Sequence, residues 1–160
     1  MNYMIKSDQY KQFFMKTEIA CGFVIFVETE NGWSVVLLDN GDFISHPKGH
    51  VEDGETKLET AIRELKEETN LIPKAHSSRV VHTKKYIIKK LSRDIKKIVH
   101  LFAGVATNAN VKISKEHRRF ILLDAFSKQA MDTLTYQDDR DSLKEALNWL
   151  QNDYISTENV

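Results

Sequence analysis

Hydrophobic and polar positions follow two different periods along this chain, and the changes of period divide it into predicted strands and helices. Residues 17–29 are rich in β-branched and aromatic types and predict a strand, which the turn sequence Asn31-Gly32 joins to a second strand over 33–38. Further strands are predicted over 79–90, 96–106 and 119–123. Gly22, inside the first strand, indicates a bulge or the close approach of another backbone.

The helical period is clearest over 57–69, where four apolar residues recur at i, i+3, i+4 and i+7 as Leu58, Ala61, Ile62 and Leu65. Asn70 and Pro73 predict the end of this helix, because asparagine tolerates left-handed geometry and proline cannot continue a helix. The preceding segment, 46–56, predicts a loop that Pro47, Gly49 and Gly54 punctuate. Helices are also predicted over 124–132 and 139–152, the second with Asp138 or Asp139 as its N-cap.

This order of elements predicts an α/β or α+β fold, a sandwich built around a mixed β-sheet. Strands dominate the front and middle of the chain, one helix interrupts them, and helices close it. A length of 160 residues is that of a single domain. We assign this domain to residues 16–155 and interpret residues 1–15 as a loosely docked N-terminal extension.

Composition and charge exclude several classes of protein. With 41% hydrophobic and 29% charged residues, the chain is not of the disordered class. Basic and acidic residues number 23 each, so no overall field draws the chain to nucleic acid or to an anionic membrane. No apolar run approaches the roughly 20 residues of a membrane span, no secretory signal is recognisable, and the single Cys21 cannot form an internal disulfide. We expect a cytoplasmic protein without membrane contact, and no protein partner is evident.

Three carboxylates share one face of the helix predicted over 57–69. Glu64, Glu67 and Glu68 stand at i, i+3 and i+4, where like charges repel by a few tenths of a kcal/mol per pair. They also lie in the C-terminal half of the helix, where the helix dipole disfavours anions. A hard divalent cation such as Mg²⁺ would turn this repulsion into binding. A bare triplet of this kind is more often a solvated acidic face, so the flanking sequence decides its interpretation.

The flanking sequence resembles the Nudix box, G-x5-E-x7-R-E-U-x-E-E-x-G-U, in which U is apolar. The match runs from Gly49 through Glu55 and Arg63 to Leu71, and it departs only at Asn70, which replaces a glycine. The resemblance implies a Nudix-type α/β/α sandwich that binds Mg²⁺, with Mn²⁺ as a possible substitute. It also implies that this enzyme cleaves a phosphoanhydride of a nucleoside diphosphate linked to another group. The implied metal ligands are the Gly49 carbonyl and Glu64, Glu67 and Glu68, while Glu55 and Arg63 are implied charge partners that orient the loop against the helix.

Other segments resemble one subfamily, the asymmetric bis(5′-nucleosyl)-tetraphosphatases. Residues 47–55 are similar to its P-K-G-H-x-E-x-G-E sequence, residues 134–140 to its L-T-Y-x-D-D-R run, and residues 116–120 to its E-H-x-x-Y/F segment. The last match implies that Glu116 reaches back to the metal cluster, as a ligand or a catalytic base. The chain departs from the subfamily after Phe120, where a tryptophan is usual, and at His46, where proline or leucine is expected.

Substrate contacts are predicted at five positions outside the carboxylate triplet. Lys48 lies next to Gly49, and we expect its ammonium to contact phosphate. His50 is equally compatible with a hydrogen bond to phosphate and with packing on the loop. An adenine base needs a flat apolar surface, and the candidates are Tyr86, Phe102 and Tyr136. The lysine-rich stretch 84–97 is either a solvated hairpin or a cationic arm over a polyphosphate or an RNA 5′ end.

These features support three hypotheses about function. The first is Mg²⁺-dependent hydrolysis of dinucleoside polyphosphates, in which diadenosine tetraphosphate and water give ATP and AMP. The second keeps the chemistry but changes the substrate, to a 5′ pyrophosphate on RNA or to a diphosphoinositol polyphosphate. The third is a non-catalytic nucleotide-binding module, which the intact set of Glu64, Glu67 and Glu68 disfavours.

Overall fold

A computed structural model describes residues 15–107 and 119–158 of the chain. Residues 1–14 of the extension predicted over 1–15, and the predicted site residue Glu116, therefore lie outside the described residues. Within them, eight strands form one sheet. The strands are β1 (Lys16–Thr29), β2 (Gly32–Asp39), β3 (Ile44–Ser45), β4 (Lys48–His50), β5 (Pro73–His76), β6 (His82–Ile88), β7 (Ile95–Ala106) and β8 (Arg119–Asp124).

The sheet is mixed, as the sequence predicts. Its path runs β3–β2–β1–β7–β5, while β4 pairs with β1, β6 with β7, and β8 with β2. The two long central strands, β1 and β7, are parallel, in a register that runs from Lys16 opposite Ile95 to Val27 opposite Ala106. All the other pairs are antiparallel.

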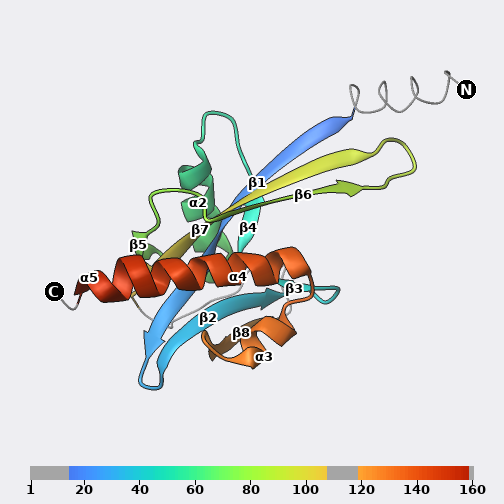
Figure 1. Ribbon diagram of the computed structural model, residues 1–160. Helices are drawn as coiled ribbons and strands as arrows, with labels where there is room; N and C mark the ends of the chain where they lie inside the picture. Colours follow the sequence, from blue (N-terminus) through green and yellow to red (C-terminus); the bar gives the residue numbers. More distant parts are fainter. Residues whose placement is uncertain (1–14, 108–118, 159–160) are drawn as a thin grey trace, which may run out of the picture.

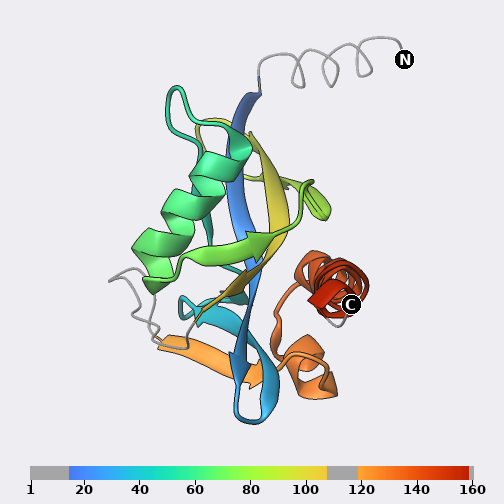
Figure 2. The ribbon, with the colours of Figure 1, turned by 90° about the vertical axis from the view of Figure 1, so that its left-hand side faces the viewer.

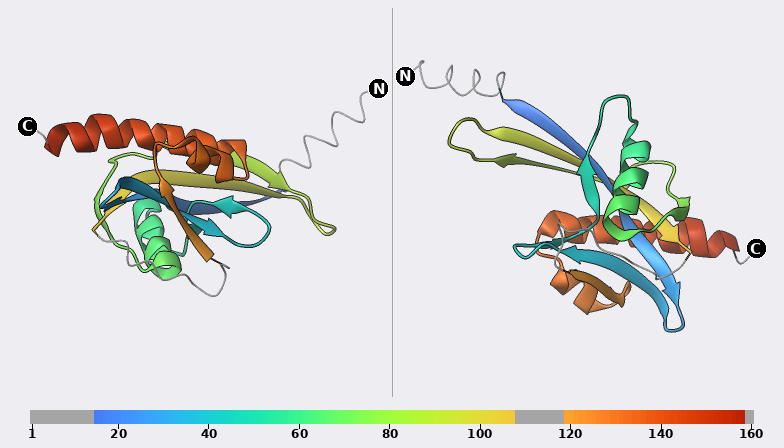
Figure 3. Two further views of the ribbon diagram at one scale, coloured as in Figure 1. Left: turned by 90° about the horizontal axis from the view of Figure 1, so that it is seen from below. Right: turned by 180° about the vertical axis from the view of Figure 1, so that it is seen from behind.

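Helices cover both faces of the sheet. Helix α2 (Lys57–Thr69) lies on one face, and α4 (Gln137–Trp149) with the π-helical η1 (Leu150–Ile155) lies on the other (Figures 1 and 2). Odd-numbered residues of β1, such as Phe23 and Ile25, pack under α2, and even-numbered ones, such as Val24 and Phe26, pack under α4. Because both faces are covered, β1 is apolar without alternation between residues 20 and 27. Figure 3 shows the resulting three layers from below.

Gly22 permits a close approach of a second backbone, which the sequence also predicts. A Cβ atom at this position would overlap the carbonyl oxygen of Pro47. Phe23 N donates to that same oxygen at 3.1 Å, and Gly22 is paired with Lys48 across the β1–β4 ladder. The segment predicted as a loop over 46–56 thus contains a short strand, and that strand is seated directly on the centre of the sheet.

Helix α2 begins and ends where the sequence predicts. Thr56 is its N-cap and forms a capping box with Glu59, which satisfies two backbone N–H groups at the first turn. Asn70 has φ 64° and ψ 12°, and its N–H donates to Lys66 O at 2.9 Å. This left-handed residue closes the helix in the way that the replaced glycine would.

The C-terminal helices differ from the prediction at three points. Helix α3 (Lys128–Thr133) begins after Ser127 rather than at 124, because Ser127 accepts from Ala130 N as its N-cap and Asp124 still belongs to β8. The N-cap of α4 is Tyr136, and Asp138 and Asp139 fall inside the first turn. The last helix runs on through η1 and α5 (Ser156–Glu158) instead of ending at 152.

Two strand predictions also need correction. The strand predicted over 79–90 is shorter, since only the part named β6 pairs with β7. The short strands β3 and β5 were not predicted from sequence, because two and four residues are too few to show a period. No helix in the described parts of the chain is long and apolar enough to cross a membrane.

The left-handed C-cap generates a prediction for stability. Asn70→Val should lower the free energy of unfolding by about 1–2 kcal/mol, because a β-branched side chain is strained at positive φ. Asn70→Gly should leave stability equal or higher. Urea unfolding of both variants measures the free energy of unfolding. If valine and glycine lowered it equally, the contacts of the Asn70 side chain, and not its left-handed backbone, would account for the stability of the cap.

Candidate active site

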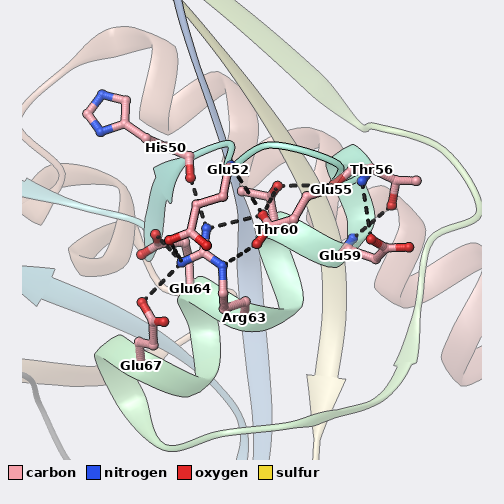
Figure 4. Close-up of polar contacts among 9 residues, drawn as sticks. All are labelled: His50, Glu52, Glu55, Thr56, Glu59, Thr60, Arg63, Glu64 and Glu67. Carbon is pink, nitrogen blue, oxygen red and sulfur yellow. Dashed lines mark hydrogen bonds and ion pairs between the residues drawn. The ribbon is translucent and has the colours of Figure 1, made fainter.

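Arg63 is the centre of a polar cluster that ties the loop before α2 to the helix itself (Figure 4). Its guanidinium donates from Nε to Glu55 Oε1 at 2.5 Å and from Nη2 to Glu55 Oε2 at 3.1 Å, a two-pronged ion pair. Nη2 also donates to the His50 carbonyl at 2.9 Å. Glu55 accepts a further hydrogen bond from Thr60 Oγ1. The pairing of Glu55 with Arg63 that the resemblance implies is therefore present.

This pairing changes the acid–base properties of both groups. The hydrogen bonds from Arg63 and Thr60 lower the pKa of Glu55 to about 2. The same contact with Glu55, supported by Glu64, raises the pKa of Arg63 above its usual value. Both side chains are thus charged over the whole range in which the protein would work.

The carboxylates of the triplet have different partners. Arg63 Nη1 donates to Glu64 Oε1 at 2.9 Å and to Glu67 Oε2 at 3.1 Å. Glu68 is buried, at 6% exposed, and its Oε2 accepts from the backbone N–H of Lys48 at 3.2 Å. Gly49 is in contact with Glu64, because a Cβ on Gly49 would overlap the Glu64 carboxylate. Carboxylates of helix α2 therefore lie against the backbone of strand β4.

The chemistry of these donors fits a hard cation. Carboxylate and carbonyl oxygens are the ligands that Mg²⁺ prefers, and the missing Cβ of Gly49 leaves room for the Glu64 carboxylate against β4. In this structure the Arg63 guanidinium lies between Glu64 and Glu67 and supplies the positive charge there. Within residues 15–107 and 119–158, no group of three or more His, Cys, Asp or Glu side chains is already arranged to hold a metal ion.

A pocket of about 560 Å³ opens next to this cluster, on the other side of β4. Three aromatic residues and three lysines dominate its lining, and they come from the β2–β3 turn, β4, the β6–β7 hairpin and the start of α4. They are Phe43, Tyr86, Tyr136, Lys48, Lys84 and Lys97. The pocket thus combines flat apolar surfaces with ammonium groups, which suits a nucleotide.

Two of the three predicted aromatic residues line this pocket. Tyr86 is 39% exposed and Tyr136 is 51% exposed, so both have free ring surface. Phe43 packs against Tyr136 with ring centroids 5.7 Å apart. The prediction for Phe102 is wrong: it is 6% exposed and packs 5.9 Å from the Phe23 ring beneath α2. Phe102 is opposite Phe23 in the β1–β7 register, on the sheet face that is turned away from the pocket.

The three lysines of the pocket lie in different electrostatic surroundings. Lys48 Nζ lies 5.5 Å from the Phe43 ring centroid and donates to Ser45 Oγ at 3.3 Å. Burial, together with the Lys84 ammonium, lowers the pKa of Lys48 to about 8. Lys84 is paired with the Asp139 carboxylate at 2.8 Å. Burial also lowers the pKa of Lys97, whose Nζ lies 2.9 Å from His50 Nε2.

His50 lies at the rim rather than in the pocket. Its side chain is 60% exposed, and Nε2 lies 3.2 Å from Glu18 Oε2 as well as close to Lys97. His46, by contrast, is buried beneath the pocket, with Nε2 at 3.0 Å from the backbone oxygen of Asp139. The basic residues of the stretch 84–97 fall into two groups. Lys84 and Lys97 face the pocket, and the remaining lysines and Arg93 are exposed.

Several residues of the site do not emerge from sequence reasoning. Phe43 and Asp139 belong to a turn and a helix start, which give no sign of what their side chains contact. Lys84 and Lys97 are hidden in a run of lysines, and only strand alternation separates the two that face the pocket from their neighbours.

The sequence of this chain is similar to that of known proteins. A family model described as NUDIX domain matches residues 18–146. An asymmetrical bis(5′-nucleosyl)-tetraphosphatase of Mus musculus is 32% identical over 112 residues, which cover 63% of this chain and 75% of that protein.

Solved structures share the fold. An Ap4A hydrolase of C. elegans in a binary complex aligns with a TM-score of 0.63 at 22% identity and covers 83% of this chain and 97% of its own. The NUDIX domain of Shewanella oneidensis NrtR, complexed with ADP ribose, aligns with a TM-score of 0.69 at 13% identity. That alignment covers 94% of this chain and 100% of the NrtR domain.

The ion pair at the centre of the cluster generates a pH prediction. The pKa of Glu55 lies below its ordinary value of 4.5 in the folded protein, so the pair stabilises the fold above that pH and is lost as the pH falls toward about 2. Glu55→Gln should therefore melt at a lower temperature than the native protein at neutral pH, and the gap should narrow as the pH falls from 4.5 toward 2. Calorimetric melting across this range checks it, and a gap that stays constant with pH would contradict it.

Proposed function

The chain belongs to the Nudix family, and on this premise we propose that it hydrolyses dinucleoside polyphosphates, converting diadenosine tetraphosphate and water to ATP and AMP with the help of Mg²⁺. One observation carries the proposal. The three-residue strand β4 supplies Lys48 to the aromatic pocket, and its next residue, Gly49, contacts Glu64 of the carboxylate cluster. A nucleotide bound in the pocket would therefore run its phosphates toward the carboxylates. The named activity of the Mus musculus relative supports the same substrate class.

The pocket supplies the binding of the base. Tyr86 and Tyr136 offer exposed ring surface, and stacking on such rings is worth about 1–3 kcal/mol per base. Phe43 packs against Tyr136 and extends the aromatic surface of the pocket. Lys48 and Lys97 line the same pocket and are the cations we assign to the polyphosphate. A phosphate beside Lys48 would favour its charged form and oppose the lowering of its pKa by burial.

The carboxylate cluster supplies the chemistry. We assign the cation to the Gly49 carbonyl, Glu64, Glu67 and Glu68, with Glu116 as an additional ligand or base from the segment outside the described residues. Bound there, Mg²⁺ would stabilise charge on phosphate and lower the pKa of a water molecule. Arg63 holds Glu64 and Glu67 at one point, and through Glu55 it keeps the loop against the helix.

The position of the cut follows from the fixed distance between the aromatic pocket and the carboxylate cluster. Water attacks the phosphorus fourth from the stacked adenosine, the bond from that phosphorus to the bridging oxygen breaks, and ATP leaves. The oxygen of water remains on AMP, and one proton is released. The position of the cut is set by reach from the stacked base, since the substrate itself is symmetric.

One observation favours a second candidate, a 5′ pyrophosphohydrolase acting on RNA. Five basic residues of the β6–β7 hairpin are exposed, outside the pocket, as Lys85, Lys89, Lys90, Arg93 and Lys96. Such a row can follow the phosphates of a longer chain. An inositol polyphosphate would use the same charges but would leave the tyrosines without a base.

The position of the cut gives the test of the proposed function. Hydrolysis of diadenosine tetraphosphate in ¹⁸O-water with Mg²⁺ should place label on AMP and none on ATP, as read by mass spectrometry. Two molecules of ADP would contradict the proposal. Turnover of triphosphorylated RNA without turnover of the dinucleotide would favour the second candidate.

The assignment of the cation gives a further prediction. Glu67→Gln should lower kcat by about 10²-fold or more, because charge-stabilising contacts of the transition state are lost. Glu67 is 56% exposed, so the loss of its 3.1 Å contact with Arg63 should cost little, and the relief of repulsion within the triplet should keep the melting temperature of the variant equal to or above that of the native protein. Glu52→Gln is the matched control, because Glu52 contacts the same Arg63 at 3.6 Å but lies outside the triplet. If Glu67→Gln kept most of the Mg²⁺-dependent activity, the metal assignment would be wrong.

A further inference from the structure

A buried ion pair lies beneath the aromatic pocket and joins two elements that are far apart in sequence. Lys84 Nζ, from β6, donates to Asp139 Oδ1, in the first turn of α4, at 2.8 Å. The two side chains are only 6% and 1% exposed. In the left view of Figure 3, the N-terminal end of α4 lies over the β6–β7 hairpin. This contact is therefore a tie between hairpin and helix.

The charge of the Lys84 ammonium is balanced by the Asp139 carboxylate, whereas the other two lysines of the pocket have no carboxylate at this distance among the contacts described above. Its partner is a carboxylate at hydrogen-bond distance, whereas Lys48 donates to a hydroxyl and the Nζ of Lys97 lies next to an imidazole. A buried, paired ammonium has little net charge to offer a phosphate. Its place in the pocket lining thus needs an explanation other than phosphate binding.

The tie spans the two tyrosines that face the pocket. Lys84 and Tyr86 are two residues apart on β6, so their side chains share one face of the strand, and Lys84 Nζ lies 5.9 Å from the Tyr86 ring centroid. Tyr136 is the N-cap of α4, three residues before Asp139. A second contact, His82 Nε2 to Asp138 Oδ1 at 3.2 Å, joins the same strand to the same turn.

Asp139 is held from below as well. His46 Nε2 lies 3.0 Å from its backbone oxygen, and this nitrogen must donate because a carbonyl can only accept. Within the described residues, His46 Nδ1 and Asp139 Oδ2 are buried without a hydrogen-bond partner. An apolar pair in place of Lys84 and Asp139 would avoid the unpaired Oδ2 and the burial of two charges, so stability alone does not account for the arrangement.

We propose that Lys84 and Asp139 are positioning residues, which fix the distance between Tyr86 and Tyr136 and thereby set the affinity of the pocket for an adenine base. The inference rests on the proposed function only in the choice of base, because the tie itself is a property of the pocket. It assigns no phosphate contact to Lys84. The directional ion pair fixes where β6 stands relative to the start of α4, which packing of apolar side chains would fix less sharply.

The experiment separates the base from the phosphates. Binding of AMP and of inorganic tripolyphosphate is measured by calorimetry without metal, for the native protein and for Lys84→Met combined with Asp139→Leu. That double variant fills the same volume without charge. The matched control combines Arg119→Met with Asp39→Asn, which removes a 2.9 Å ion pair between β8 and β2, where Arg119 is 66% exposed.

The double variant should bind AMP about tenfold more weakly, as expected when stacking is partly lost. Its affinity for tripolyphosphate should be unchanged, and the control should match the native protein for both probes. Lys84→Arg, which keeps a cation opposite Asp139, should bind AMP as the native protein does. In turnover of diadenosine tetraphosphate, the double variant should raise KM and leave kcat unchanged.

The opposite pattern overturns the proposal. Weaker tripolyphosphate with unchanged AMP would make Lys84 a phosphate ligand, and unchanged affinity for both would remove its role in the pocket. If the double variant does not fold, Asp139→Asn, which keeps the shape of the side chain, is measured in its place: weaker AMP supports positioning, and tighter tripolyphosphate identifies a released phosphate ligand. Because AMP binding needs no hydrolysis, a native protein that binds AMP but does not cleave diadenosine tetraphosphate would refute the proposed function alone.

Discussion

The close contact of β4 with β1 is the constraint on which the site depends. It exists because Gly22 has no side chain where Pro47 and Lys48 approach. With β4 in this position, Lys48 lies in the pocket and Gly49 lies against Glu64. Two consecutive residues of one strand therefore reach two regions of the site. The Arg63–Glu55 pair then fixes the loop that follows β4 to α2. Backbone contact therefore comes first, and the charged cluster stabilises an arrangement that Gly22 makes possible.

Arg63 resolves a problem that the carboxylate triplet creates. Three glutamates over one helical turn repel, and their place near the C-terminal end of α2 adds to the cost. Arg63 Nη1 contacts two of them, and the Lys48 N–H donates to the third, so each carboxylate has a positive or donor partner in this structure. The helix can therefore fold with its acidic face intact.

Local sequence predicts the bounds of α2 and the pairing of Glu55 with Arg63, but it does not predict which side chains line the pocket. The bounds of α2 follow from the apolar stripe, Asn70 and Pro73, and the ion pair of Glu55 with Arg63 follows from the family pattern. Phe102 shows where local reasoning fails, because an aromatic residue in a strand faces either the pocket or the core, and only the β1–β7 register decides. Asp139 shows it again: it has the composition of an N-cap but serves as a buried partner 55 residues away from Lys84.

The two halves of the site carry opposite charge, although the chain as a whole carries none. Lysines line the pocket, and glutamates line the helix on the other side of β4. A polyphosphate is attracted to the first and repelled by the second, and unit charges a few ångströms apart interact by about 4 kcal/mol near a protein surface. Productive binding thus needs a positive charge between phosphate and carboxylate. Substrate and cation should therefore bind with positive coupling, because each removes the repulsion that the other would meet.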